Sequence, residues 1–151
     1  HLFGQKRALA IDPDGFEGKP CLKIVPLSEP SKNYRVNCWA PGDPQYRARG
    51  AKAFTLKVKG ARKFMWFSAY KNYRYVGSQR FKARVKLPDD PDVWHTVIVS
   101  ADRFEPDAKT RHHHEGIEQL DSFDGVQVIH IGGPSGENVE VRIADVKWKD
   151  E

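Results

Sequence analysis

The chain has 151 residues and a net charge of +5 at pH 7, from 25 lysines and arginines against 20 aspartates and glutamates. This length suits one domain with a substantial core, so residues 1–151 are expected to form a single domain. Hydrophobic residues make up 39% of the sequence, which argues against intrinsic disorder. No apolar run is long enough to span a bilayer. The positive charge favours anionic partners without choosing among them.

Apolar residues recur with a period of two, which is the period of β-strands. In RFKARVKL, Arg80–Leu87, every second residue is apolar and the others are Arg or Lys, so this strand is predicted to have one apolar and one basic face. The segment AFTLKVKG, Ala53–Gly60, alternates in the same way. Nine strands are predicted in chain order: Arg7–Ile11, Cys21–Val25, Tyr34–Trp39, Ala53–Gly60, Phe64–Tyr70, Arg80–Leu87, Trp94–Ser100, Val126–Ile131 and Val139–Trp148.

Turn-forming sequences such as PDG, APGD, PDDPD and GGPSGEN separate these strands. The longest interruption, Ala101–Asp124, has room for a helical turn around Glu115–Leu120. Many short strands with Gly and Pro between them, and no amphipathic helix, predict an all-β fold built as an antiparallel β-sandwich.

The two cysteines leave two states open. If Cys21–Val25 pairs antiparallel with Tyr34–Cys38 and Val25 faces Tyr34, then Cys21 faces Cys38 and a cross-strand disulfide is geometrically feasible. The alternative is a pair of buried free thiols, which are common in cytosolic domains. A disulfide would favour an extracellular setting.

The order of several segments resembles a known family. GKPCLKIVP, AFTLKVKG, VWHTVIVSADRF, LDSFDGVQVIHIGG and VEVRIADVKW follow one another as in the galactose-binding-domain-like jelly rolls of carbohydrate-binding modules. In that pattern a Trp opens a strand that ends in a Ser/Asp-x-Phe turn, here Trp94 to Phe104, and an Ile-x-Asp-Val strand, here Ile143 to Val146, closes the domain. The resemblance, from about Gly18 to Trp148, implies a jelly-roll fold and a non-catalytic module tethered to a secreted polysaccharide-degrading enzyme.

The same resemblance implies a structural calcium ion near the terminal strands. Carboxylate oxygens are suitable calcium ligands, although short acidic turns are also common without a metal. The candidate ligands are Asp12, Asp14, Glu17 and Asp145.

The predicted strand Phe64–Tyr70 can expose aromatic side chains. Trp66 and Tyr70 share one face of this strand and Met65 and Phe67 share the other, and only one face can be core. If Met65 and Phe67 point inward, the two exposed rings lie on an open sheet face. The opposite orientation would bury Trp66 and leave an ordinary solvated sheet face decorated with lysine.

Basic residues would surround the exposed rings in the first orientation, namely Lys57, Lys82 and Arg84. Aromatic faces pack against the C–H faces of sugars, and Arg and Lys bind sulfate or carboxylate groups. The combination predicts an acidic or sulfated polysaccharide as the ligand.

Two loops extend the predicted binding site, because loops on a rigid scaffold commonly carry binding residues. WAPGDPQYRARGAK begins at Trp39, and KNYRYVGSQR follows Tyr70; a packed connector is the alternative for the first loop. Trp94 and Trp148 are expected in the core. The predicted ligand-binding residues are Trp39, Tyr46, Arg47, Arg49, Trp66, Tyr70, Tyr73, Arg74, Lys82 and Arg84.

A few residues point to other functions, either catalysis or nucleic-acid binding. An N-terminal His1 could hold copper as in lytic polysaccharide monooxygenases, and Gln127 with His130 resembles part of the alginate-lyase set, but their spacing of three places them on opposite faces. In RHHHEG only His112 and His114 could share a metal, which is too few ligands. Basic strands with aromatic residues also grip single-stranded nucleic acid, although no nucleic-acid-binding signature is present.

The sequence therefore predicts a monomeric, secreted carbohydrate-binding module without catalytic residues. Its expected partner is an anionic polysaccharide, and neither a membrane nor nucleic acid is expected to bind.

Overall fold

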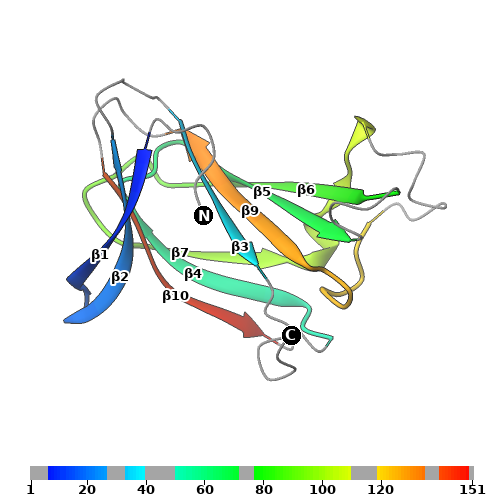
Figure 1. Cartoon of the computed structure of the whole chain (residues 1–151), viewed down its shortest axis with the longest axis horizontal. Helices are drawn as coiled ribbons and strands as arrows, with labels where there is room; N and C mark the ends of the chain where they lie inside the picture. Colours follow the sequence, from blue (N-terminus) through cyan, green and yellow to red (C-terminus); the bar gives the residue numbers. More distant parts are fainter. Residues whose placement is uncertain are drawn as a thin grey trace.

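The computed structural model is an antiparallel β-sandwich of jelly-roll type (Figure 1). It describes residues 7–26, 33–39, 50–71, 77–109, 119–134 and 140–149, of which residues 7–9, 26 and 33–39 are described by their backbone alone. One five-stranded sheet has the order β3-β9-β5-β6-β8 and the other β1-β2-β10-β4-β7. The strands are β1 Arg7–Phe16, β2 Lys19–Pro26, β3 Asn33–Trp39, β4 Ala53–Lys59, β5 Phe64–Lys71, β6 Gln79–Lys86, β7 His95–Ser100, β8 Glu105–Pro106, β9 Val128–Pro134 and β10 Val141–Lys149.

The nine predicted strands all appear, with shifted ends, and the sandwich prediction is confirmed. The additional two-residue strand β8 follows a short 3-10 helix, η2, at Ala101–Arg103, within the predicted interruption. Most of the region expected to hold a helical turn, Glu115–Leu120, lies outside the described residues. Within the described ranges, no helix has the length and apolar character needed to cross a bilayer.

The core lies between the two sheets and is rich in phenylalanine. Phe54 of β4 packs edge-on against Phe67 of β5 at 5.4 Å, measured between ring centroids. Phe123 lies 5.4 Å from Phe54 and 5.5 Å from Phe104. All four rings are almost fully buried. Each such side chain contributes about 1.5–3 kcal/mol relative to an exposed one, so this cluster holds the two layers together.

A tight two-residue turn joins β1 and β2 into a hairpin. Phe16 pairs with Lys19, leaving Glu17 and Gly18 as a two-residue turn in which both φ angles are positive, 49° and 72°. This combination is typical of a type I′ hairpin, for which Gly is suited because it lacks a Cβ. The hairpin forms the edge of its sheet, and β2 pairs with β10 on its other side.

The predicted pairing of the two cysteine-containing strands is wrong. β2 and β3 belong to different sheets, because β2 pairs with β1 and β10 whereas β3 pairs with β9. Cys21 is a buried free thiol, so the cross-strand disulfide with Cys38 does not form. Burial raises the pKa of the Cys21 thiol, and the nearby Asp12 carboxylate raises it further.

Candidate functional site

The outer face of the sheet containing β5 and β6 carries aromatic and basic side chains together. On β5, Met65 and Phe67 are buried in the core, so Trp66 and Tyr70 lie on the opposite face, where both are half-buried. β6 pairs with β5 so that Arg84 is opposite Trp66 and Lys82 opposite Ser68. The predicted orientation, with Met65 and Phe67 inward, is therefore confirmed.

The indole of Trp66 lies over the backbone of β9. Trp66 pairs with Gly132, and a Cβ placed on Gly132 would stand 2.2 Å from Cζ2 of the indole. Only a glycine leaves this space open, because any side chain there would displace the ring. Because Gly132 has no side chain, the indole can lie directly on the β9 backbone; we call this space at Gly132 the seat of the indole.

A polar network holds the residues next to Trp66. Arg80 donates to the hydroxyl of buried Ser68 from Nε and Nη2, at 3.3 and 3.1 Å. Its Nε also lies 3.5 Å from Oδ2 of Asp107, whose side chain is 8% exposed. The Arg80 guanidinium is 5.7 Å from the centroid of the Tyr70 ring, which in turn packs 4.7 Å from buried His130. Arg80 is therefore fixed by several neighbours at once.

An open groove of about 520 Å³ runs over this face. Its lining combines the Trp66 ring with charged residues from three elements, β6, β8 and η2. The Lys82 side chain is 56% exposed and its Nζ lies 3.9 Å from Asp107. The Arg84 guanidinium lies 4.0 Å from the centroid of the Phe64 ring. The charged lining residues are Arg80, Lys82, Arg84, Arg103 and Glu105.

The structure brings four of the ten predicted ligand-binding residues onto this face: Trp66, Tyr70, Lys82 and Arg84. The backbone of Trp39, at the end of β3, pairs with Val128, which also pairs with Tyr70. The Trp39 side chain lies outside the described part of the structure, as do Tyr46, Arg47, Arg49, Tyr73 and Arg74.

Three earlier expectations about neighbouring residues need correction. Lys57 is on β4 in the other sheet, where Nζ bonds to Thr96, so it does not join the Trp66 face. Trp94 is half-buried beside Phe16, with ring centroids 5.0 Å apart. Trp148 packs against Phe54 and Phe123 but remains 38% exposed. Neither tryptophan is fully enclosed by the core.

Sequence reasoning missed Arg103 and Glu105 as groove residues. Both follow β7 in a segment without a period-two pattern. The sequence therefore carries no signal that this segment returns to the face of β5 and β6. The period-two pattern also places Ser68 on the face of Trp66 and Tyr70, but Ser68 was not among the predicted ligand-binding residues.

The predicted calcium ligands do not converge. The Asp12 carboxylate accepts a hydrogen bond from Nε of Arg142 at 2.9 Å, and this contact is the main cause that lowers the pKa of Asp12. Asp14 and Glu17 are exposed on the hairpin, and Asp145 pairs with Lys147 at 3.0 Å. Among the residues that the structure describes, no three His, Cys, Asp or Glu side chains are grouped so as to hold a metal ion.

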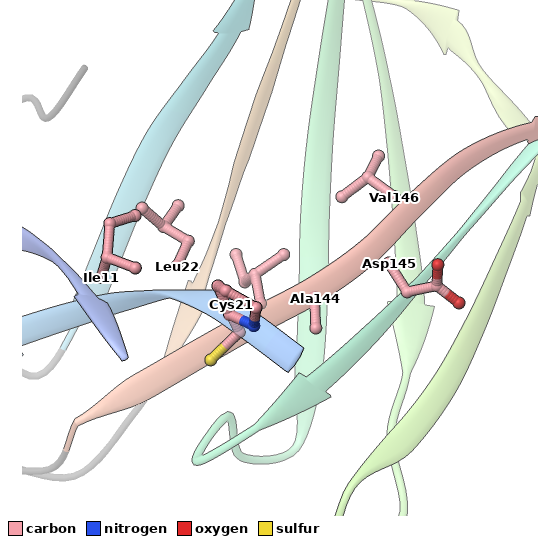
Figure 2. A pocket seen from close by; sticks show the side chains of 8 residues that line it. Ile11, Cys21, Leu22, Ala144, Asp145 and Val146 are labelled. Carbon is pink, nitrogen blue, oxygen red and sulfur yellow. The ribbon is translucent and has the colours of Figure 1, made fainter. Parts of the chain in front are cut away.

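A second hollow of about 280 Å³ lies where β1, β2 and β10 meet (Figure 2). It is mainly apolar, with Ile11 and Leu22 adjacent and Cys21 beneath them. The Asp145 carboxylate points away from Cys21 in this view. Asp145 is the one acidic residue among those that line this hollow, whereas the calcium prediction requires several carboxylates to meet.

Of the residues considered for catalysis, the structure describes only Gln127 and His130. His1, His112 and His114 lie outside the described residues. Gln127 is exposed just before β9, where its N–H donates to the Tyr70 carbonyl at 2.9 Å, whereas His130 is only 2% exposed.

Comparison with known proteins shows which solved structures share this fold. No protein-family model matches the sequence, and no curated protein matches it significantly. Among solved structures, the family 11 carbohydrate-binding module of the cellulosomal cellulase Lic26A-Cel5E of Clostridium thermocellum is similar, with a TM-score of 0.66 and 14% identity, over 99% of this chain and 85% of that one. A family 30 carbohydrate-binding module gives a TM-score of 0.58 and 15% identity, over 99% and 77% of the two chains.

An exo-β-agarase contains the same fold as part of a longer chain. Its TM-score is 0.60 at 11% identity, and the similarity covers all of this chain but 23% of the agarase. At such low identities the similarity establishes the fold alone. The expected resemblance is confirmed at that level: this chain has the jelly-roll fold of these carbohydrate-binding modules.

Proposed function

We propose that the chain is a non-catalytic carbohydrate-binding module that binds a polysaccharide across the outer face of β5 and β6. The observation that carries this proposal is the Trp66 indole, which is seated over Gly132 and lines an open groove. A flat ring of this kind offers an apolar surface to the C–H face of a sugar, while polar neighbours bind the hydroxyl groups.

The ligand is proposed to be acidic or sulfated. Four of the five charged residues that line the groove are cations, and guanidinium groups bind sulfate and carboxylate with paired hydrogen bonds. The similar family 11 module has been solved with a β-1,3-1,4-mixed-linked tetrasaccharide, which supports a glycan ligand in general. The anionic character of the ligand rests on the groove of this chain.

We further propose that the module is secreted and is joined to a polysaccharide-degrading enzyme. The similarity to one part of an exo-β-agarase supports this, because there the fold lies within a longer enzyme chain. A structural calcium ion stays a prediction, which elemental analysis of the purified protein can test.

Affinity electrophoresis with agarose, κ-carrageenan, pectate and mixed-linked β-glucan tests the function. Wild-type protein is expected to be retarded by at least one anionic glycan, and Trp66→Ala is expected to lose the retardation because the stacking surface is gone. Trp94→Ala is the matched control, because this half-buried Trp packs against Phe16 instead of the groove. Unchanged retardation of Trp66→Ala, or no retardation of the wild type by any glycan, would refute the proposal.

A large loss of stability in Trp66→Ala would mean that the ring is mainly structural. Phe67→Ala provides the scale, since truncation of this fully buried neighbour should cost about 3–5 kcal/mol. Trp66→Ala should cost clearly less, measured by urea unfolding. A single-stranded oligonucleotide added as competitor separates glycan binding from nucleic-acid binding.

A further inference from the structure

The cations that line the groove are not equivalent. Arg80 is occupied, because Ser68, Asp107 and the Tyr70 ring all contact its guanidinium group. Lys82 shares Asp107 with it, at 3.9 Å. Arg84 and Arg103, by contrast, form no ion pair with any carboxylate within the described ranges. Their charges are therefore available to a ligand.

Arg84 is also held in place without using its N–H donors. Its guanidinium carbon lies 4.0 Å from the centroid of the Phe64 ring, and this cation–π contact involves no oxygen acceptor, so it leaves N–H groups of the guanidinium for other partners. The edge of the guanidinium carries the N–H groups that bind an oxyanion in pairs. Phe64 thus positions Arg84 for anion binding.

The order of the elements places the available cations on one side of Trp66. Trp66 is on β5, Arg84 is directly opposite on β6, and η2, which ends at Arg103, leads into β8 on the far side of β6. The two strand spacings from β5 to β8 amount to roughly 10 Å. A chain lying across these strands would meet the aromatic surface first and the two guanidinium groups next.

A carboxylate in the same groove limits how much negative charge a ligand can carry. Glu105 is exposed, lines the groove and is opposite Lys82 in the register of β8 and β6. Asp107 lies next to the same lysine. A uniformly charged chain would bring like charges against Glu105, which is unfavourable. A chain with separated charges avoids this repulsion.

From these placements we infer that the groove selects a sparsely charged polysaccharide. A neutral sugar stacks on Trp66, and the adjacent sugar places one oxyanion between Arg84 and Arg103. This inference rests on the proposed function and adds to it the position and spacing of the charge. A sulfate ester and a uronate carboxylate share the required chemistry.

Four polysaccharides test whether the groove prefers sparse charge, dense charge or no charge. κ-Carrageenan has one sulfate in each disaccharide, and hyaluronan has one carboxylate in each disaccharide. Agarose provides a neutral reference, and dextran sulfate is densely charged. Affinities are measured by isothermal titration at physiological salt for the wild type, Arg84→Gln, Arg103→Gln and Lys86→Gln. Lys86 is the matched control, because it is exposed on the same face of β6 but does not line the groove.

Arg84→Gln and Arg103→Gln are each expected to weaken binding of κ-carrageenan or hyaluronan about tenfold or more, because a charge-assisted hydrogen bond is lost. Lys86→Gln should change it by no more than about twofold, as expected for a solvated surface charge. Binding of agarose should be the same in all three variants. Whichever of the two anionic probes responds identifies the oxyanion as sulfate or carboxylate.

The inference is overturned if both arginine variants behave like Lys86→Gln, if neither κ-carrageenan nor hyaluronan binds, or if dextran sulfate shows the same arginine-specific loss as the alternating chains. If, in those cases, Trp66→Ala still loses the retardation that a glycan of the affinity-electrophoresis panel causes for the wild type, the proposed function survives and only the charge assignment fails. If Trp66→Ala binds like the wild type, both are refuted.

Discussion

The Trp66 indole occupies the space in which a side chain at position 132 would stand, 2.2 Å from the place of the missing Cβ. The two residues are direct neighbours in the pairing of β5 with β9. The Trp66 indole and the space beside Gly132 therefore depend on each other, although the two residues are far apart in the sequence. The orientation of the ring depends on a residue that itself offers no side chain to a ligand.

Replacing Gly132 by Ala should displace the indole from its seat. The added methyl group would overpack the contact, at a cost of about 1–3 kcal/mol in the free energy of unfolding. Glycan binding should fall with it, and tryptophan fluorescence should shift toward that of a more exposed ring. Urea unfolding and affinity electrophoresis measure the two effects.

A double-mutant cycle identifies the cause of this loss. In a Trp66→Ala background the space beside position 132 is empty, so Gly132→Ala should then have almost no effect on stability. An equal cost in both backgrounds would show that the glycine serves the β9 backbone and not the indole.

The faces of β5 and β6 could be predicted from the sequence because alternation along a strand is a local property. Met65 and Phe67 alternate with Trp66 and Tyr70, so the period shows which side chains of β5 share a face. Which of the two faces is buried follows only from the structure, in which Ser68 on the Trp66 face is buried as well. The same pattern in β6 placed Lys82 and Arg84 on the outer face.

Strand pairing could not be predicted in this way. The expected hairpin between the strands of Cys21 and Cys38 was reasonable because neighbouring strands in sequence often pair, yet β2 finds its partner in β10, at the other end of the chain. The seat at Gly132 and the groove residues Arg103 and Glu105 depend on such long-range contacts. Period and composition carry no information about them.

Asp107 should prove important for stability despite its place at a surface groove. Its carboxylate is 8% exposed, lies near Arg80 and Lys82, and accepts the backbone N–H of Lys109 at 2.9 Å. Asp107→Asn leaves the part-buried Arg80 without its charged neighbour, which should cost about 1–3 kcal/mol in urea unfolding. Glu105→Gln, at an exposed position, should stay within about 0.5 kcal/mol of the wild type. Equal effects of the two changes would contradict this role.

Cys21 should react slowly with alkylating agents in the native protein. The thiol is 4% exposed, and burial raises its pKa, so little of the nucleophilic thiolate is present at neutral pH. In a Cys38→Ser variant, iodoacetamide should modify Cys21 much faster in urea than under native conditions, as followed by mass spectrometry. Equal rates would show that the thiol is accessible, and a Cys21–Cys38 disulfide in purified wild-type protein would contradict the structure.

The ion pair between Asp12 and Arg142 should stabilise the protein at neutral pH but not in acid. The hydrogen bond from Arg142 lowers the pKa of Asp12 from its ordinary value of 3.8, and the Asp14 N–H lowers it further. A carboxylate whose folded pKa is below its unfolded pKa adds stability above the unfolded value and loses that contribution as the pH falls through the folded value.

Asp12→Asn should therefore be less stable than the wild type at pH 7, and the difference should shrink below about pH 3.8 and vanish once the wild-type carboxyl group is protonated. Urea unfolding at a series of pH values measures this. Asp14→Asn removes an exposed carboxylate from the same hairpin and should leave the stability at pH 7 unchanged. A difference between wild type and Asp12→Asn that persists undiminished in acid would mean that the aspartate acts through hydrogen-bond geometry and not through its charge.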